Sequence, residues 1–119
     1  MTKHDLQPPV IVIDGLDVSL YPTVEAAMLD LEGVDVADGV YRVFDAVGRK
    51  ITLRAEGVRR GRWSVDIGTV HLDGADAVPT GVEELQRALL DHLGACGVLL
   101  AQRTALAALV RLVEQRHRY

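Results

Sequence analysis

The sequence predicts an α+β domain in which an antiparallel sheet of about five strands carries three helices, packed mainly on one face. Two observations lead to this fold class. Short β-branched or alternating apolar runs, separated by turns rich in glycine and aspartate, occupy much of residues 10–21 and 40–73. Apolar residues at helical spacing follow the first of these regions and dominate the last third of the chain.

The N-terminal part predicts a hairpin followed by a helix. Val10–Ile13 is a β-branched run, Asp14-Gly15 is a strong hairpin signal, and residues 16–20 alternate apolar with polar side chains. Thr23 can cap the helix because its hydroxyl accepts a bond from a backbone N–H that lacks a partner. Gly33 is expected to end it. The apolar stripe of this helix is Val24, Ala27, Met28 and Leu31.

The middle of the chain predicts further strands. We expect strands at Val40–Phe44 and Lys50–Ala55, joined by a tight Asp45–Gly48 turn in which the aspartate bonds the turn amides. Residues 63–67 alternate in the same way, and Thr69–Leu72 has the composition of a short strand.

The last third predicts two helices. Thr80 and Glu83 have the spacing of a capping box, and Gly94 is a natural stop for the helix that follows them. A second long helix is expected over residues 98–117. The buried stripe of the first of these helices is Val82, Leu85, Leu89 and Leu93.

Length and composition indicate one domain over residues 1–119, with residues 1–9 as a flexible tail. Cys96 is the single cysteine and cannot form an internal disulfide, and the N-terminus lacks the apolar core of a signal peptide. We therefore expect a cytoplasmic protein. The apolar stretch Val98–Val113 is interrupted by polar residues and is shorter than the ~20 residues of a bilayer span, so no membrane contact is expected. Eleven arginines against two lysines are typical of GC-rich bacterial coding sequences.

The net charge of −4 is unevenly distributed along the chain. Residues 1–40 contain eight acidic side chains and one lysine, whereas residues 41–73 contain seven basic and four acidic side chains. The two regions either neutralise each other within the fold or leave an acidic face for a basic partner. The candidate partner-binding residues are Asp30, Glu32, Asp35 and Asp38.

Residues with metal or nucleophile chemistry are dispersed, and the sequence predicts no catalytic, cofactor or metal site. A zinc site normally brings together three or four histidine or cysteine ligands. His92 and Cys96 lie four residues apart, but Gly94 is expected to break the helix between them. Carboxylates can still assemble in space without a sequence motif, and the candidates for such an acid–base site are Asp14, Asp17, Asp35, Asp38 and Asp45.

One basic patch has an aromatic residue beside it, at residues 59–63. Arginines and a stacking ring suit single-stranded nucleic acid. The acidic chain and the apolar face that Trp63 shares with Val65 and Ile67 instead favour a core tryptophan beneath a solvated loop. Nucleic acid is therefore not an expected partner.

The predicted 98–117 helix is apolar on nearly all sides, so it should be buried on more than one side. It is either the central helix of the domain or one half of a dimer seam, and we favour the central helix. The residues of such a seam would be Leu99, Leu106, Val110 and Val113.

Residues 16–55 resemble small bacterial proteins, some of them similar to immunity proteins of polymorphic toxin systems. The matching segments are Asp17–Tyr21, Val24–Ala27, Leu31-Glu32, Asp35-Val36, Gly39–Asp45 and Gly48–Leu53. The resemblance implies a protein partner, such as a toxin, and carries no catalytic residue with it.

The function predicted from the sequence is therefore a non-catalytic protein-binding module, of the immunity-inhibitor type, that presents an acidic surface to its partner. One alternative is a structural or regulatory homodimer built on the C-terminal helix. The second alternative is an enzyme with a spatially assembled carboxylate site.

Overall fold

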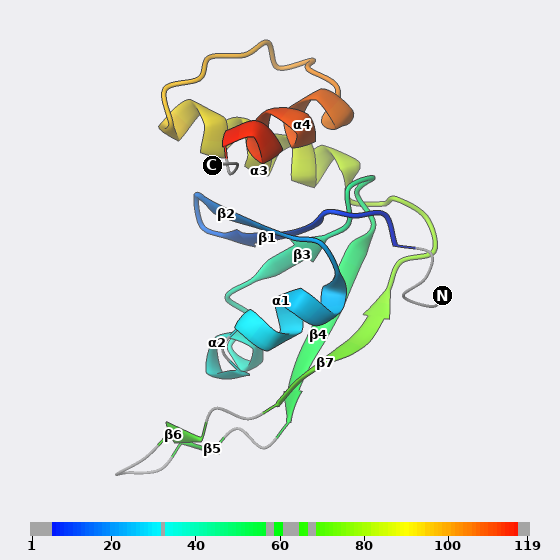
Figure 1. Cartoon of the computed structure of the whole chain (residues 1–119), viewed down its shortest axis with the longest axis vertical. Helices are drawn as coiled ribbons and strands as arrows, with labels where there is room; N and C mark the ends of the chain where they lie inside the picture. Colours follow the sequence, from blue (N-terminus) through cyan, green and yellow to red (C-terminus); the bar gives the residue numbers. More distant parts are fainter. Residues whose placement is uncertain (1–5, 32, 57–58, 61–64, 67–68, 117–119) are drawn as a thin grey trace.

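The computed structural model describes residues 6–31, 33–56, 59–60, 65–66 and 69–116. A five-stranded antiparallel sheet has the order β2-β1-β3-β4-β7, and β5 and β6 form a separate pair. The predicted α+β class and sheet are confirmed. In chain order the elements are β1 (Val10–Asp14), β2 (Asp17–Tyr21), α1 (Val24–Asp30), α2 (Gly33–Ala37), β3 (Arg42–Phe44), β4 (Lys50–Glu56), β5 (Arg59–Arg60), β6 (Val65–Asp66), β7 (Thr69–Ala75), α3 (Val82–Ala95) and α4 (Leu106–Arg116) (Figure 1).

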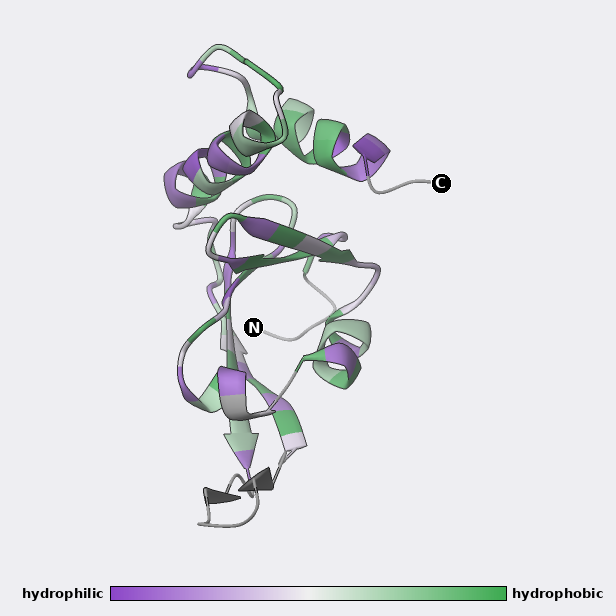
Figure 2. Ribbon diagram, turned by 90° about the vertical axis from the view of Figure 1, so that its left-hand side faces the viewer, coloured by the Kyte–Doolittle hydropathy of each residue, from purple (hydrophilic) through white to green (hydrophobic). Residues whose placement is uncertain are grey.

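The helices lie on both sides of the sheet, which differs from the expectation that they pack mainly on one face. Figure 2 shows α3 and α4 on one side of the β1–β2 hairpin and α1 and α2 on the other. The reason lies in β1, where four consecutive apolar residues are buried. Since side chains alternate across a strand, such a run must be covered on both of its faces.

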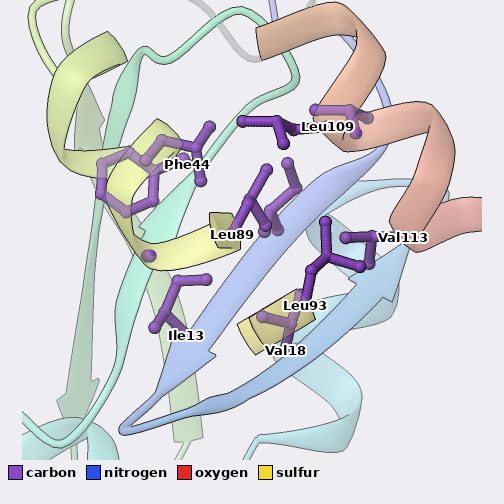
Figure 3. Close-up of a cluster of buried hydrophobic side chains, with 11 residues drawn as sticks. Ile13, Val18, Phe44, Leu89, Leu93, Leu109 and Val113 are labelled. Atoms are coloured by element: carbon purple, nitrogen blue, oxygen red, sulfur yellow. The ribbon is translucent and has the colours of Figure 1, made fainter. Parts of the chain in front are cut away.

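The side chains on one face of the sheet pack against α3 and α4. Leu89 and Leu93 of α3 and Leu109 and Val113 of α4 are fully buried against Ile13 and other residues of the sheet (Figure 3). We call this cluster the α3–α4 core; its buried members are Ile11, Ile13, Val18, Phe44, Leu85, Ala88, Leu89, Leu93, Leu109, Val110 and Val113.

The side chains on the opposite face of the sheet pack against α1, and the partly buried Val36 of α2 packs against this cluster. We call this cluster the α1–α2 core. It contains fewer buried residues than the α3–α4 core, and its partly buried members include two tyrosines, Tyr21 and Tyr41. Its buried members are Val10, Val12, Val24, Ala27, Leu31, Val43 and Ile51.

The two predicted turns of the sheet are present. In the β1–β2 hairpin, Asp14 is paired with Asp17 across a turn that begins at Gly15. In the β3–β4 turn, the fully buried Asp45 accepts bonds from the backbone N–H groups of Val47 at 3.1 Å and Arg49 at 2.8 Å. Gly48 has a φ of +94°, a conformation that a residue with a Cβ rarely adopts.

The described part of the N-terminal segment is attached to the domain and is not a free tail from residue 6 onward. The Gln7 N–H donates to Asp45 Oδ2 at 3.1 Å, and the Ala46 N–H donates to the Gln7 carbonyl at 2.9 Å. The flexible tail predicted over residues 1–9 therefore extends too far toward the C-terminus. Residues 1–5 lie outside the described residues.

The first helix begins as predicted and ends earlier. The Ala26 N–H donates to Thr23 Oγ1 at 3.1 Å, so Thr23 is the N-cap. The helix ends at Asp30 because Leu31 has extended dihedral angles. Gly33 begins the short helix α2. The prediction that Gly33 ends a helix is therefore wrong, and α2 has no counterpart among the predicted elements.

The predicted limits of the third helix are wrong at both ends. Its N-cap is Gly81, without a side-chain cap bond, and the Thr80 hydroxyl instead donates to Asp76. The helix continues past Gly94 to Ala95. It ends where Gly97 has a φ of +87° and the Val98 N–H donates back to the Leu93 carbonyl at 2.8 Å, as expected for a glycine that terminates a helix.

The C-terminal helix begins at Leu106 and not at Val98. A turn precedes it, in which both the N–H and the hydroxyl of Thr104 donate to the Ala101 carbonyl. The prediction counted apolar residues of this connection as helical, and the helix therefore seemed apolar on all sides. The actual helix has one apolar stripe: Leu106, Leu109, Val110 and Val113.

Candidate functional site

The predicted acidic residues come from one short stretch on the α1–α2 side of the sheet. Asp30 is the last residue of α1, Asp35 is in α2 and Asp38 follows α2 directly. Glu32 lies outside the described residues. We call Asp30, Asp35 and Asp38 the acidic segment; Asp30 and Asp38 are exposed and Asp35 is half-buried.

Two of these carboxylates accept hydrogen bonds from the hydroxyls of tyrosines that lie in, or directly before, strands of the sheet. The Tyr21 hydroxyl donates to Asp30 Oδ2 at 2.5 Å, and the Tyr41 hydroxyl donates to Asp35 Oδ2 at 3.3 Å. Burial of its ring, together with the hydrogen bond to Asp30 and the negative charge there, raises the pKa of Tyr21 to about 12. The two bonds give Asp30 and Asp35 fixed positions at the surface.

An exposed leucine lies beside the acidic segment. Leu29 is 90% exposed, while Val24 and Ala27 of the same helix are buried. If a partner protein covers this side chain, burial of its apolar area contributes to the binding free energy. Leu29 was not predicted as a candidate residue, because the apolar stripe of this helix indicates only the side chains that face the core; the available signal was a leucine outside that stripe.

A pocket of about 260 Å³ opens where β3 and β4 separate. The β3–β4 ladder contains two residue pairs, whereas the β4–β7 ladder contains six. The β3–β4 pairing stops at Val43↔Ile51. The residues that precede β3 connect it to α2, whereas β4 continues beyond Ile51. The pocket fills the resulting gap. Its lining residues are Val36, Gly39, Tyr41, Arg42, Val43, Phe44, Lys50, Ile51, Thr52, Leu53 and Glu84.

The rim of this pocket carries two cations and one carboxylate. Arg42 Nη1 lies 3.4 Å from Glu84 Oε2, and Lys50 Nζ lies 3.2 Å from Glu84 Oε1. These side chains come from β3, β4 and the first turn of α3, so the ion triad links the sheet to the helix. At 38–48% exposure the three charges remain accessible to solvent.

The pocket and the acidic segment are neighbours along the chain. Val36 lies between Asp35 and Asp38 and lines the pocket, as does Gly39. Neither Asp35 nor Asp38 lines the pocket, whose charged lining residues are Arg42, Lys50 and Glu84. No sequence pattern indicated the pocket, because its walls come from segments that only the fold brings together.

His92 and Cys96 are closer than the sequence analysis expected, because α3 continues through Gly94. Cys96 Sγ lies 4.0 Å from His92 Nε2, and His92 Nδ1 lies 2.8 Å from the Leu16 carbonyl oxygen. Since a carbonyl only accepts, Nδ1 is the protonated nitrogen in this arrangement. The described residues contain no group of three or more His, Cys, Asp or Glu side chains placed to hold a metal ion.

The residues proposed for a dimer seam do not form one surface. Val110 and Val113 are buried in the chain's own core, and Leu106 packs at its margin. Leu99 is 91% exposed but belongs to the connection before α4. A seam of these four residues would require the α3–α4 core to open.

The remaining candidates have the following positions. Asp45 is surrounded by donors that explain it as a structural residue, since three backbone N–H groups and the Arg49 guanidinium contact it. The pocket at the β3–β4 gap has Glu84 as its carboxylate.

The basic patch lies largely outside the described residues: residues 61–64 are not described, and of Arg59 and Arg60 only the backbone in β5 is described. No helix in the described ranges is both long and apolar enough for a membrane span.

Searches against protein-family models, curated proteins and solved structures find no match to this chain.

Proposed function

We propose that this protein is a non-catalytic binding module that contacts a basic partner protein through the α1–α2 side of the sheet. The observation that carries the proposal is the combination of Leu29, which is 90% exposed, with the carboxylates of Asp30, Asp35 and Asp38. Carboxylates accelerate association with a basic surface, while an apolar side chain that becomes buried supplies affinity.

The tyrosine bonds support this assignment. Side chains that are already held in place lose less conformational entropy when a partner binds. Asp30 and Asp35 are held by Tyr21 and Tyr41, at 2.5 and 3.3 Å. A surface that served only for solubility would not need its carboxylates in fixed positions.

The proposal includes an inhibitory role of the immunity-protein type, in which the acidic segment covers a basic active site of a toxin. The resemblance of residues 16–55 to such proteins supports this role, and that range contains the whole acidic segment. A toxin that acts on nucleic acid would present the positive charge that such a surface fits.

The experiment is a pull-down with the products of neighbouring genes, followed by measurement of the affinity at low and high salt. Replacement of Asp30, Asp35 and Asp38 by lysine should slow association and reverse the salt dependence of its rate, because salt then screens a repulsion. Leu29→Ala should accelerate dissociation and leave the salt dependence unchanged.

The matched control reverses the charge at Asp14 and Asp17, which are exposed carboxylates at the β1–β2 hairpin. If the control variant loses as much affinity as the acidic-segment variant, or if neither changes binding, the proposed face is wrong. Circular dichroism of every variant checks that the fold is retained.

A further inference from the structure

The pocket at the β3–β4 gap has the chemistry of a ligand site, and this inference does not depend on the proposed protein partner. Its lining includes residues that belong to both cores: Ile51 and Val43 belong to the α1–α2 core, and Phe44 belongs to the α3–α4 core. The pocket therefore lies where the sheet itself opens, between its two layers of helices.

The pocket wall is apolar and its size is limited. Val36 and Leu53 are partly exposed and provide aliphatic surface, whereas Val43 and Ile51 are only 5% exposed. Pockets for drug-sized ligands are commonly about 300–1,000 Å³. At about 260 Å³ this one suits a smaller molecule with a short, branched or linear apolar group.

The rim determines the charge of the ligand. Arg42 and Lys50 share the single carboxylate of Glu84, so the triad has a net charge of +1. A guanidinium has five N–H donors and an ammonium has three, and each group makes one contact to Glu84. Glu84 therefore fixes the positions of both cations while further donors of each remain available to an anion. A guanidinium fork also fits the two oxygens of a carboxylate.

We propose that this pocket binds a small amphiphilic carboxylate, with its apolar group against Val36 and Leu53 and its carboxylate on Arg42 and Lys50. Two sources can supply this chemistry. One is a free short-chain carboxylic acid. The other is the C-terminal residue of a polypeptide, which combines an apolar side chain with a carboxylate.

The test is a titration of the full chain followed by two-dimensional ¹H–¹⁵N NMR at constant ionic strength. The probes are 4-methylpentanoate and its neutral counterpart 4-methylpentanamide, N-acetyl-leucine and N-acetyl-leucinamide, and inorganic phosphate. We expect both carboxylates or one of them to shift the amides of residues 36, 39, 41–44 and 50–53. Each neutral amide should bind about two- to fivefold more weakly than its acid, as is typical of partly exposed charge contacts.

Variants assign the roles of the rim. Arg42→Gln and Lys50→Gln should each weaken the acid by about two- to fivefold and leave the affinity for the neutral amide unchanged. Arg87→Gln is the matched control, since Arg87 is a cation of α3 that pairs with Asp91 and does not line the pocket. It should have no effect.

The outcomes distinguish between the two sources of the carboxylate and also test the proposal itself. Tighter binding of 4-methylpentanoate assigns the pocket to free acids, and equal or tighter binding of N-acetyl-leucine assigns it to polypeptide C termini. Equal binding of acid and amide, equal binding of phosphate, an equal loss in Arg87→Gln, or no shift at these amides would each overturn the proposal.

Discussion

The two sides of the sheet differ in how they use their side chains. On the α3–α4 side, helices of 14 and 11 residues bury leucine and valine almost completely, and their stripes face inward. On the α1–α2 side, helices of seven and five residues cover a smaller core, and Leu29, Asp30 and Asp38 are exposed there. The difference indicates that one side supplies most of the stability and leaves the other free to carry a recognition surface.

The largest expected difference follows from truncating one leucine on each side. Leu89 is fully buried and Leu29 is 90% exposed. Leu89→Ala should lower the free energy of unfolding by about 3 kcal/mol, because it removes buried methyl groups and leaves a cavity. Leu29→Ala should change it by less than about 0.5 kcal/mol. Urea denaturation measures both, and similar losses in the two variants would contradict the comparison.

The β3–β4 turn tests how closely the sheet packs on the α3 side. A Cβ on Gly48 would lie 2.8 Å from Val82 Cγ2 and 2.9 Å from Val82 Cα, whereas a Cβ on Gly15 would meet nothing within 4 Å. Both glycines have positive φ, so Gly15→Ala should cost about 1 kcal/mol from backbone strain alone. Gly48→Ala should cost about 2–3 kcal/mol because the contact with α3 adds to the strain. Equal thermal shifts for the two variants would show that the turn is not pressed against the helix.

These stability predictions also show where sequence reasoning succeeds. The β-branched run of β1, the cap at Thr23 and the Asp45–Gly48 turn are local signals, and each was predicted correctly. The limits of α3 and α4 were not, because a glycine at position 94 is compatible with a helix interior when Gly97 ends it. The distribution of helices over both faces could have been predicted from the uninterrupted apolar run of β1.

The site was less accessible to sequence reasoning than the fold. The acidic segment was predicted as a set of residues, but the short helix α2 has no apolar stripe that would reveal it. The tyrosine bonds and the pocket depend on contacts between distant segments: Arg42 and Glu84 lie 42 residues apart. Neither charge pattern nor periodicity contains that information.

The helix caps provide a smaller test of the same comparison. Thr23→Ala should destabilise the protein by about 1 kcal/mol, because it removes the bond from the Ala26 N–H at the start of the seven-residue helix α1. Thr80→Ala should cost less than about 0.5 kcal/mol, since Thr80 does not cap α3. A larger loss for Thr80→Ala would restore the capping box that the sequence suggested.

The last test concerns the protonation of Tyr21. Its pKa of about 12 lies above the ordinary value near 10, so folding favours the neutral phenol. This contribution to stability is complete below about pH 10 and is lost as the pH rises through 12. Asp30→Asn should lower the pKa of Tyr21 but leave it above 10, because burial of the ring is its largest cause.

The pKa is measured from the tyrosine ¹³Cζ shift in a pH titration. Asp38→Asn serves as the control and should leave the Tyr21 curve unchanged. An unchanged curve in Asp30→Asn would mean that Asp30 is not held by Tyr21 in solution, and the preorganised carboxylate would have to be abandoned.

The bond between Gln7 and Asp45 ties the N-terminal segment to the β3–β4 turn. It joins positions 38 residues apart, and the loop that it closes contains β1 to β3, including α1 and α2. Both ends of this loop meet at a carboxylate that is fully buried. Removal of Gln7 would thus act at the middle of the chain, because Asp45 and the Ala46 N–H would lose these bonds, while the β1–β3 ladder would still close the loop.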